Sequence, residues 1–161
     1  MKIIVSILIL VNTLFASTQL FGFTFGSIYT GNCVYDSIPN EFTNGFDYFY
    51  EFHRDVETYL HGDAQIKVYI SPTSNRIYKI AVVEWISNAG DRAQKYEYLK
   101  YGIQSKYGRV SETTGDFNTA FVKVEVLYIK TSYSKSYSNY VVTEYTNSVG
   151  YNRMLNESRA L

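Results

Sequence analysis

Apolar and polar residues alternate in short runs along the chain, and this alternation predicts paired β-strands. Residues 66–70 alternate, residues 71–75 are small and polar with one proline, and residues 77–86 form a second apolar run. A proline fixes the backbone for a turn, and small polar side chains hydrogen-bond within it. The pattern therefore predicts a β-hairpin over 66–86.

A second hairpin is predicted in the C-terminal half, where two β-branched runs cover 121–130 and 140–146. The segment between them, 131–139, is rich in serine and tyrosine and is predicted to be an exposed, flexible connection. Near the N-terminus, residues 21–26 alternate phenylalanine with glycine or threonine and predict a short strand.

Apolar residues spaced by three and four predict an amphipathic helix that starts with an acidic turn at Asp91 and ends at Gly108. Residues 46–60 are ambiguous, because their first half alternates like a strand while the spacing in their second half favours a helix. Residues 27–45 are predicted to be a long loop with room for one short element. The tail, 151–161, is predicted to add a last helical turn or two.

This order of elements favours the α+β class, since adjacent hairpins with helices between them build antiparallel sheets. We predict a mostly antiparallel sheet built from two hairpins, with one or two helices packed on one face. Residues 17–161 have a suitable length for one such domain, and no internal repeat indicates a second.

The first sixteen residues have the three parts of a cleavable signal peptide. Lys2 supplies the positive charge, residues 3–11 are apolar except for one serine, and a small residue, Ala16, marks the predicted cleavage site. A membrane-spanning helix needs about 20 apolar residues, roughly twice this run. We therefore predict export to the periplasm or beyond, with no membrane span after cleavage.

Composition narrows the classes of partner. Acidic and basic residues balance at 15 each and are interspersed, which gives no electrostatic footprint for nucleic acid.

The single cysteine, Cys33, cannot close an intramolecular disulfide, so the core must hold the domain together. With 17 tyrosines and 10 phenylalanines the chain has many rings for such a core, and a surface ring could also bind a partner.

Two sets of residues are candidates for a site. His53, Glu57 and His61 are spaced by four and would share one helix face, where they could bind a metal; the alternative is a solvated polar face. Tyr133, Lys135 and Tyr137 lie in a serine-tyrosine stretch and predict an adaptable binding surface; the alternative is a hairpin tip in solvent. The motifs of nucleophile elbows, zinc proteases and phosphate loops do not occur, and no cofactor is predicted.

Several short motifs resemble those of small exported bacterial proteins of uncharacterised function. They are the Phe-Gly start at 21–26, the Tyr-Ile-Ser-Pro hairpin at 69–72 with 76–80, Leu99-Lys100, and the helix ending Lys-Tyr-Gly at 106–108. The chain lacks the helix that usually follows the Phe-Gly start in those proteins. The resemblance implies this fold and, with a signal ending similar to those of Gram-negative bacteria, the periplasm.

The sequence thus predicts an exported, non-enzymatic binding or interaction module whose partner is a protein or an envelope component. Two alternatives stay open. One is a small hydrolase that depends on a metal or on a pair of carboxylates, and the other is an immunity-type inhibitor of a secreted toxin.

Overall fold

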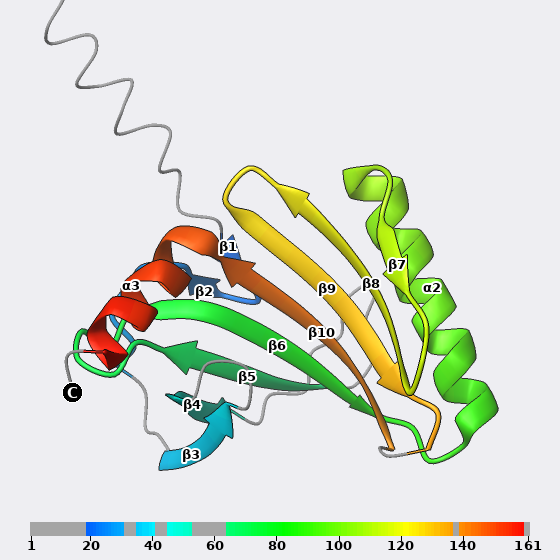
Figure 1. The fold of residues 1–161 in the computed structure, drawn as a ribbon, viewed down its shortest axis with the longest axis horizontal. Coiled ribbons are helices and arrows are strands. Elements are labelled where there is room, and N and C mark those ends of the chain that lie inside the picture. The colour runs from blue at the N-terminus through cyan, green and yellow to red at the C-terminus, as the bar shows by residue number, and fades with distance from the viewer. Residues whose placement is uncertain (1–18, 31–34, 41–44, 53–63, 137–138, 160–161) are drawn as a thin grey trace, which may run out of the picture.

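The computed structural model describes residues 19–30, 35–40, 45–52, 64–136 and 139–159, with 35–40 and 45–52 described by their backbone only. Eight strands form one antiparallel sheet in the spatial order β3-β4-β5-β6-β10-β9-β8-β7 (Figure 1). The strands of this sheet are β3 Tyr35–Asn40, β4 Gly45–Phe52, β5 Gln65–Ile70, β6 Ile77–Trp85, β7 Ser111–Thr113, β8 Phe117–Val124, β9 Leu127–Ser134 and β10 Tyr140–Asn147.

In the part of the chain that the structure describes, two helices pack against the sheet, which confirms the predicted α+β class. Helix α2, Ala89–Tyr107, follows β6 and carries the chain to the far edge, from which β7, β8, β9 and β10 return strand by strand to pair beside β6. Helix α3, Ser148–Ser158, follows β10 directly. It begins before the predicted tail helix, because the side chain of Asn147 caps it by accepting from the Gly150 N–H at 2.9 Å.

The predicted hairpin over 66–86 is confirmed as β5 and β6. Its turn is closed by backbone hydrogen bonds between Ser71 and Arg76 and between Asn75 and Ser71. The carboxylate of Glu157, at the end of α3, accepts the backbone N–H groups of Thr73 and Ser74 at 3.0 Å each. The polar turn thus also holds the C-terminal helix in place.

The second hairpin differs from the prediction. The run 121–130 is not one strand, because the chain turns at Glu125, whose φ is 53°, and pairs β8 with β9. The segment 131–139 is not wholly a loop either, since its first four residues belong to β9. Val124 and Val126 both favour a strand, so strand propensity does not reveal the turn at Glu125, which lacks glycine, asparagine and proline.

Three N-terminal expectations are also refined. Where one strand was expected over 21–26, residues 19–24 form a tight hairpin, with β1 Gln19–Leu20 and β2 Phe23–Thr24 joined by positive φ angles at Phe21 and Gly22. The first half of 46–60 is strand β4, and its predicted helical half lies outside the described residues. Strand β3 is the one short element for which the predicted loop left room.

The predicted helix is confirmed as α2, and its ends follow local chemistry. Asn88 caps the first turn by accepting from Gly90 and Asp91, and the chain leaves the helix at Gly108 with a φ of 91°. Its buried residues Tyr96 and Leu99 pack with sheet residues that include Ala120 and Val141. This side of the sheet, called the helix face below, carries the core residues Ile66, Val68, Ile80, Val82, Ala120, Ile129, Tyr133, Val141 and Tyr145.

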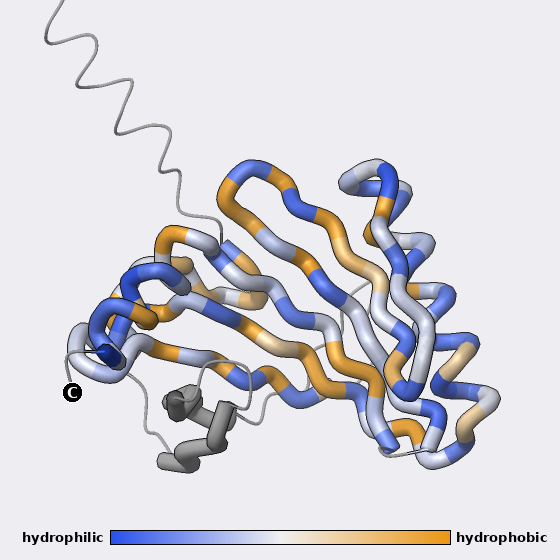
Figure 2. Tube along the Cα trace, viewed as in Figure 1, coloured by the Kyte–Doolittle hydropathy of each residue, from blue (hydrophilic) through white to orange (hydrophobic). Residues whose placement is uncertain are grey.

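The other side of the sheet is called the open face below. It is formed by the alternate residues 79–85 of β6, 117–123 of β8, 128–134 of β9 and 140–146 of β10, and alternating hydropathy is visible along β9 in Figure 2. Helix α3 packs at one end of this side, where a Cβ on Gly150 would lie 2.9 Å from the Cβ of Tyr78. A bulge in β6 turns Tyr78 to this side, toward Tyr69 and Tyr151.

Candidate functional site

Three large aromatic residues lie in one row at the end of the open face away from α3. The register pairs Phe117 with Ser134 and Tyr140 with Trp85. Ser134 and Tyr140 lie opposite each other, one step beyond the Tyr133–Val141 pair. The row therefore crosses β8, β9, β10 and β6. Trp85, Phe117 and Tyr140 are called the aromatic row below.

All three residues of the aromatic row are exposed to solvent. Trp85 is 63% exposed, Phe117 53% and Tyr140 36%. The Trp85 and Tyr140 rings meet edge to face, with centroids 5.3 Å apart and an interplanar angle of 73°. Isolated surface rings are common, but neighbouring exposed rings on one flat surface mark sites of interaction.

Arg92 contacts the chain segments that lie next to Trp85 and Tyr140. It is 4% exposed, and its Nη1 donates to the carbonyl oxygens of Ile86 at 2.9 Å and Ser87 at 2.7 Å. Longer contacts of 3.4 Å reach Asn139 Oδ1 and the Lys135 carbonyl. Ile86 follows Trp85 and Asn139 precedes Tyr140, so one guanidinium anchors the backbone after Trp85 and contacts the side chain before Tyr140.

Beyond the aromatic row, the open face becomes charged. Glu144 lies between Lys79, at 3.4 Å, and Lys130, with which it also forms an ion pair. Burial raises the pKa of the Glu144 carboxyl, but the two ammonium groups outweigh this effect and leave the pKa below its ordinary value. The Phe121 and Tyr128 rings stack beside this cluster, with centroids 5.5 Å apart.

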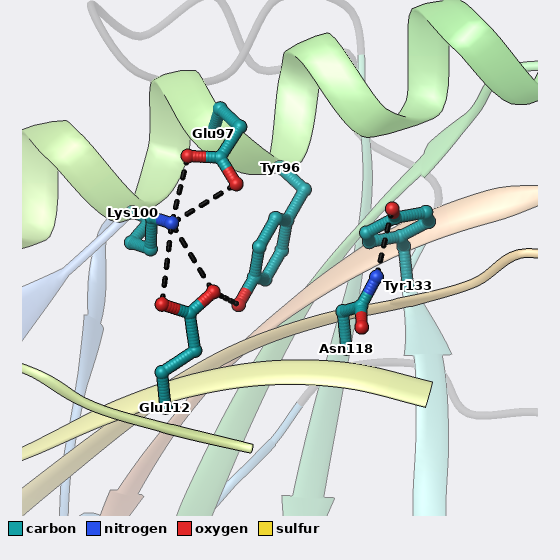
Figure 3. A network of polar contacts seen from close by, with 6 residues as sticks. All are labelled: Tyr96, Glu97, Lys100, Glu112, Asn118 and Tyr133. Carbon is teal, nitrogen blue, oxygen red and sulfur yellow. Dashed lines mark hydrogen bonds and ion pairs between the residues drawn. The ribbon is translucent and has the colours of Figure 1, made fainter. Parts of the chain in front are cut away.

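On the helix face, a polar network joins α2 to the sheet (Figure 3). The Tyr96 hydroxyl donates to Glu112 at 3.0 Å, and Lys100 bridges Glu112 at 3.1 Å and Glu97 at 2.7 Å. In the same view, Asn118 donates to the Tyr133 hydroxyl at 2.8 Å. The Tyr96 and Tyr133 rings contact each other with centroids 5.0 Å apart.

The charges of this network are fixed near neutral pH. Burial and the Glu112 carboxylate raise the pKa of Tyr96 far above its ordinary value, so the phenol keeps its proton. The Glu97 carboxylate raises the pKa of Lys100 against a smaller effect of burial, while Lys100 lowers the pKa of Glu112. General acid-base catalysis needs a group that titrates near the working pH. Tyr96, Lys100 and Glu112 therefore attach α2 to the sheet and are not poised to exchange protons.

The structure separates the residues of the predicted binding stretch. Tyr133 is 7% exposed in β9 and faces α2, whereas Lys135 is exposed just beyond the strand. Tyr137 lies outside the described residues, so a binding role for the three together stays a prediction. Sequence reasoning missed the aromatic row, whose members are separated in the chain and meet only through strand register.

The predicted metal ligands His53, Glu57 and His61 lie outside the described residues, as does Cys33. Among the residues that are described, no group of three or more histidine, cysteine, aspartate or glutamate side chains could hold a metal ion. In the same part of the chain, no helix combines the length and apolar character needed to cross a membrane.

Comparison with known proteins finds no family model, no curated protein and no solved structure that matches this chain. Function is therefore inferred from the site itself. The resemblance to small exported proteins stays a prediction.

Proposed function

We propose that this protein is an exported, non-enzymatic binding module that takes a protein or an envelope component on the open face of its sheet. The observation that carries the proposal is the aromatic row, in which Trp85 and Tyr140 are in contact and Phe117 lies on the same line beyond Ser134, all three rings being exposed. Tryptophan and tyrosine dominate the binding energy of protein interfaces, because each ring brings a large contact area with few rotamers to freeze.

The support of the row favours binding further. Antiparallel pairing fixes the backbone of β8, β9, β10 and β6, and Arg92 fixes the chain beside Trp85 and Tyr140. A surface that is already ordered loses little conformational freedom when a partner arrives. Inhibition of a secreted toxin would be a special case of the same activity on the same face.

Site-specific photo-crosslinking tests the proposal. A photoreactive phenylalanine analogue replaces Tyr140 in one sample and Tyr101, a 72% exposed residue of α2, in the control. In cells that make the protein, we expect a discrete covalent adduct from position 140 and none from position 101. Adducts of equal yield at both positions, or none at position 140, would contradict a binding role for the open face.

Export has its own test. If residues 1–16 are a signal peptide, the intact mass of the protein from its producing cells will correspond to a chain that starts at Ser17. Recovery of the protein from the cytosol with Met1 still attached would contradict the compartment and leave the aromatic row to be explained by an intracellular partner.

A further inference from the structure

We infer that the end of the aromatic row includes a subsite for one carboxylate of a protein partner, and that the guanidinium of Arg92 binds this carboxylate. The inference rests on the proposed function and adds the chemical group that the partner presents. It comes from the surroundings of Arg92, which is 4% exposed and whose hydrogen-bond acceptors in the described part of the chain are all uncharged.

The guanidinium of Arg92 has donors to spare. Nη1 is occupied by the carbonyl oxygens of Ile86 and Ser87 and by a longer contact with Asn139. Nη2 carries two N–H groups but contacts a single described acceptor, the Lys135 carbonyl, at 3.4 Å. Nε is buried and has no hydrogen-bond partner among the described residues. Nε and Nη2 lie along one edge of the guanidinium, and a carboxylate can accept from both at once.

The positive charge of Arg92 is not balanced by the fold. Among the residues that the structure describes, no carboxylate forms an ion pair with it. Asp91, its neighbour in the first turn of α2, is exposed, and so is Asp116, which precedes β8. Glu84 is already paired with Lys95 at 2.7 Å. A buried charge is costly unless an opposite charge accompanies it, so an anion that reaches Arg92 is favoured.

A carboxylate can reach this guanidinium from the end of β9. The contact between the Lys135 carbonyl and Nη2 is long, and Lys135 itself is exposed and adds a second positive charge. Its carbonyl can turn to water without loss of a strong hydrogen bond, which leaves Nη2 and Nε to the ligand. A carboxylate carries one charge, as the guanidinium does, and its two oxygens match the two donors of that edge.

The position of Arg92 connects this subsite to the aromatic row. Its acceptors Ile86 and Asn139 adjoin Trp85 and Tyr140 in the chain. A ligand can therefore place an apolar side chain on these rings and its carboxylate on Arg92. The two rings meet edge to face at 73° and do not form one flat platform, which favours a peptide over a stacked sugar.

Binding of a small carboxylate tests the inference, with Trp85, the single tryptophan of the chain, as the fluorescent reporter. N-acetylphenylalanine combines a ring with a carboxylate, and its amide is the uncharged control. At constant ionic strength in chloride buffer, we expect the acid to change the Trp85 fluorescence saturably and the amide to bind about tenfold more weakly.

A pair of matched variants assigns the effect to the guanidinium. We expect Arg92→Lys to weaken binding of the acid about tenfold and to leave binding of the amide unchanged, because an ammonium keeps the charge but has no paired edge. Arg109→Lys, the same change at an exposed position after α2, should alter neither.

The outcomes separate the inference from the proposed function. Equal binding of acid and amide, both lost in Tyr140→Ala, would overturn the carboxylate subsite and keep the aromatic row as a binding surface. Equal weakening of both compounds in Arg92→Lys would assign Arg92 a structural role alone. No saturable response to either compound would overturn the inference, while crosslinking from position 140 would still decide the proposed function. Tighter binding of glucuronate than of N-acetylphenylalanine, with the same dependence on Arg92, would replace the peptide by an acidic sugar.

Discussion

The two faces of the sheet use the same kinds of side chain for different purposes. On the helix face, the rings of Tyr96 and Tyr133 are buried against each other and their hydroxyls are hydrogen-bonded. On the open face, the rings of Trp85 and Tyr140 also touch, but much of their surface remains in water. The first arrangement stabilises the domain, and the second leaves apolar area available to a partner.

This contrast shows why the abundance of tyrosine and phenylalanine has no single explanation. A ring on a strand faces one side or the other according to its position, and a shift of one residue exchanges the two roles. Tyr133 and Ser134 are neighbours in β9, yet Tyr133 lies under α2 and Ser134 lies on the opposite side of the sheet, between Phe117 and Tyr140. Stability and binding can therefore be changed separately, and the predictions below test that separation in order of decreasing effect.

The largest loss of stability is expected on the helix face. Leu99 of α2 is 1% exposed, and Leu99→Ala would leave a cavity beside Ala120 and Val141. We expect the free energy of unfolding to fall by about 3 kcal/mol. Urea denaturation measures it, and Tyr101→Ala on the exposed side of the same helix is the control. A loss below about 1 kcal/mol would mean that α2 is not packed as described.

A smaller effect that reaches both faces is expected at Arg92. Arg92→Met removes the donors to the Ile86 and Ser87 carbonyls and should cost about 2 kcal/mol of stability. The backbone beside Trp85 loses its anchor, so the fluorescence anisotropy of that single tryptophan should also fall. Arg92→Lys should recover only part of the stability and of the anisotropy. One ammonium cannot reach the Ile86 and Ser87 carbonyls and the Asn139 side chain together. A fall in stability with unchanged anisotropy would show that Arg92 does not position Trp85.

The ion pairs of the open face predict a dependence on pH. The pKa of Glu144 in the folded protein lies below its ordinary value of 4.5, so the carboxylate stabilises the fold above that pH. This stabilisation is lost as the pH falls through the folded pKa. Glu144→Gln should cost about 1.5 kcal/mol near neutral pH, and the difference from wild type should shrink in acid.

The matched control for this titration is Glu125→Gln, at an exposed position in the β8–β9 turn. We expect its stability to follow that of the wild type at every pH. A difference between Glu144→Gln and wild type that stays constant down to acid would assign the effect to packing instead of charge.

Local chemistry explains which elements could be predicted. The hairpin β5–β6 has a Ser-Pro turn, and α2 has Asn88 and Gly108 at its ends, so the residues that define these elements are adjacent in the chain. The β8–β9 turn at Glu125 could not be predicted, because a non-glycine residue with positive φ has no signature in the sequence.

The candidate site required information that the sequence does not carry locally. Trp85, Phe117 and Tyr140 come from three strands, and their meeting depends on the register of β6, β10, β9 and β8 together. Register is fixed by the burial of the helix face, which is a property of the whole domain. The serine-tyrosine stretch has a local pattern that predicts binding, yet its Tyr133 is buried.

The smallest loss of stability is expected where the loss of binding is greatest. Trp85 is 63% exposed, so Trp85→Ala removes little buried surface apart from the edge contact with Tyr140. We expect the free energy of unfolding to change by less than about 1 kcal/mol. Crosslinking from position 140 to the partner should nevertheless be abolished, since buried tryptophans dominate interface energies. If Trp85→Ala destabilised the domain as much as Leu99→Ala does, the open face would be a structural surface covered within the protein itself, and the aromatic row would have no binding role.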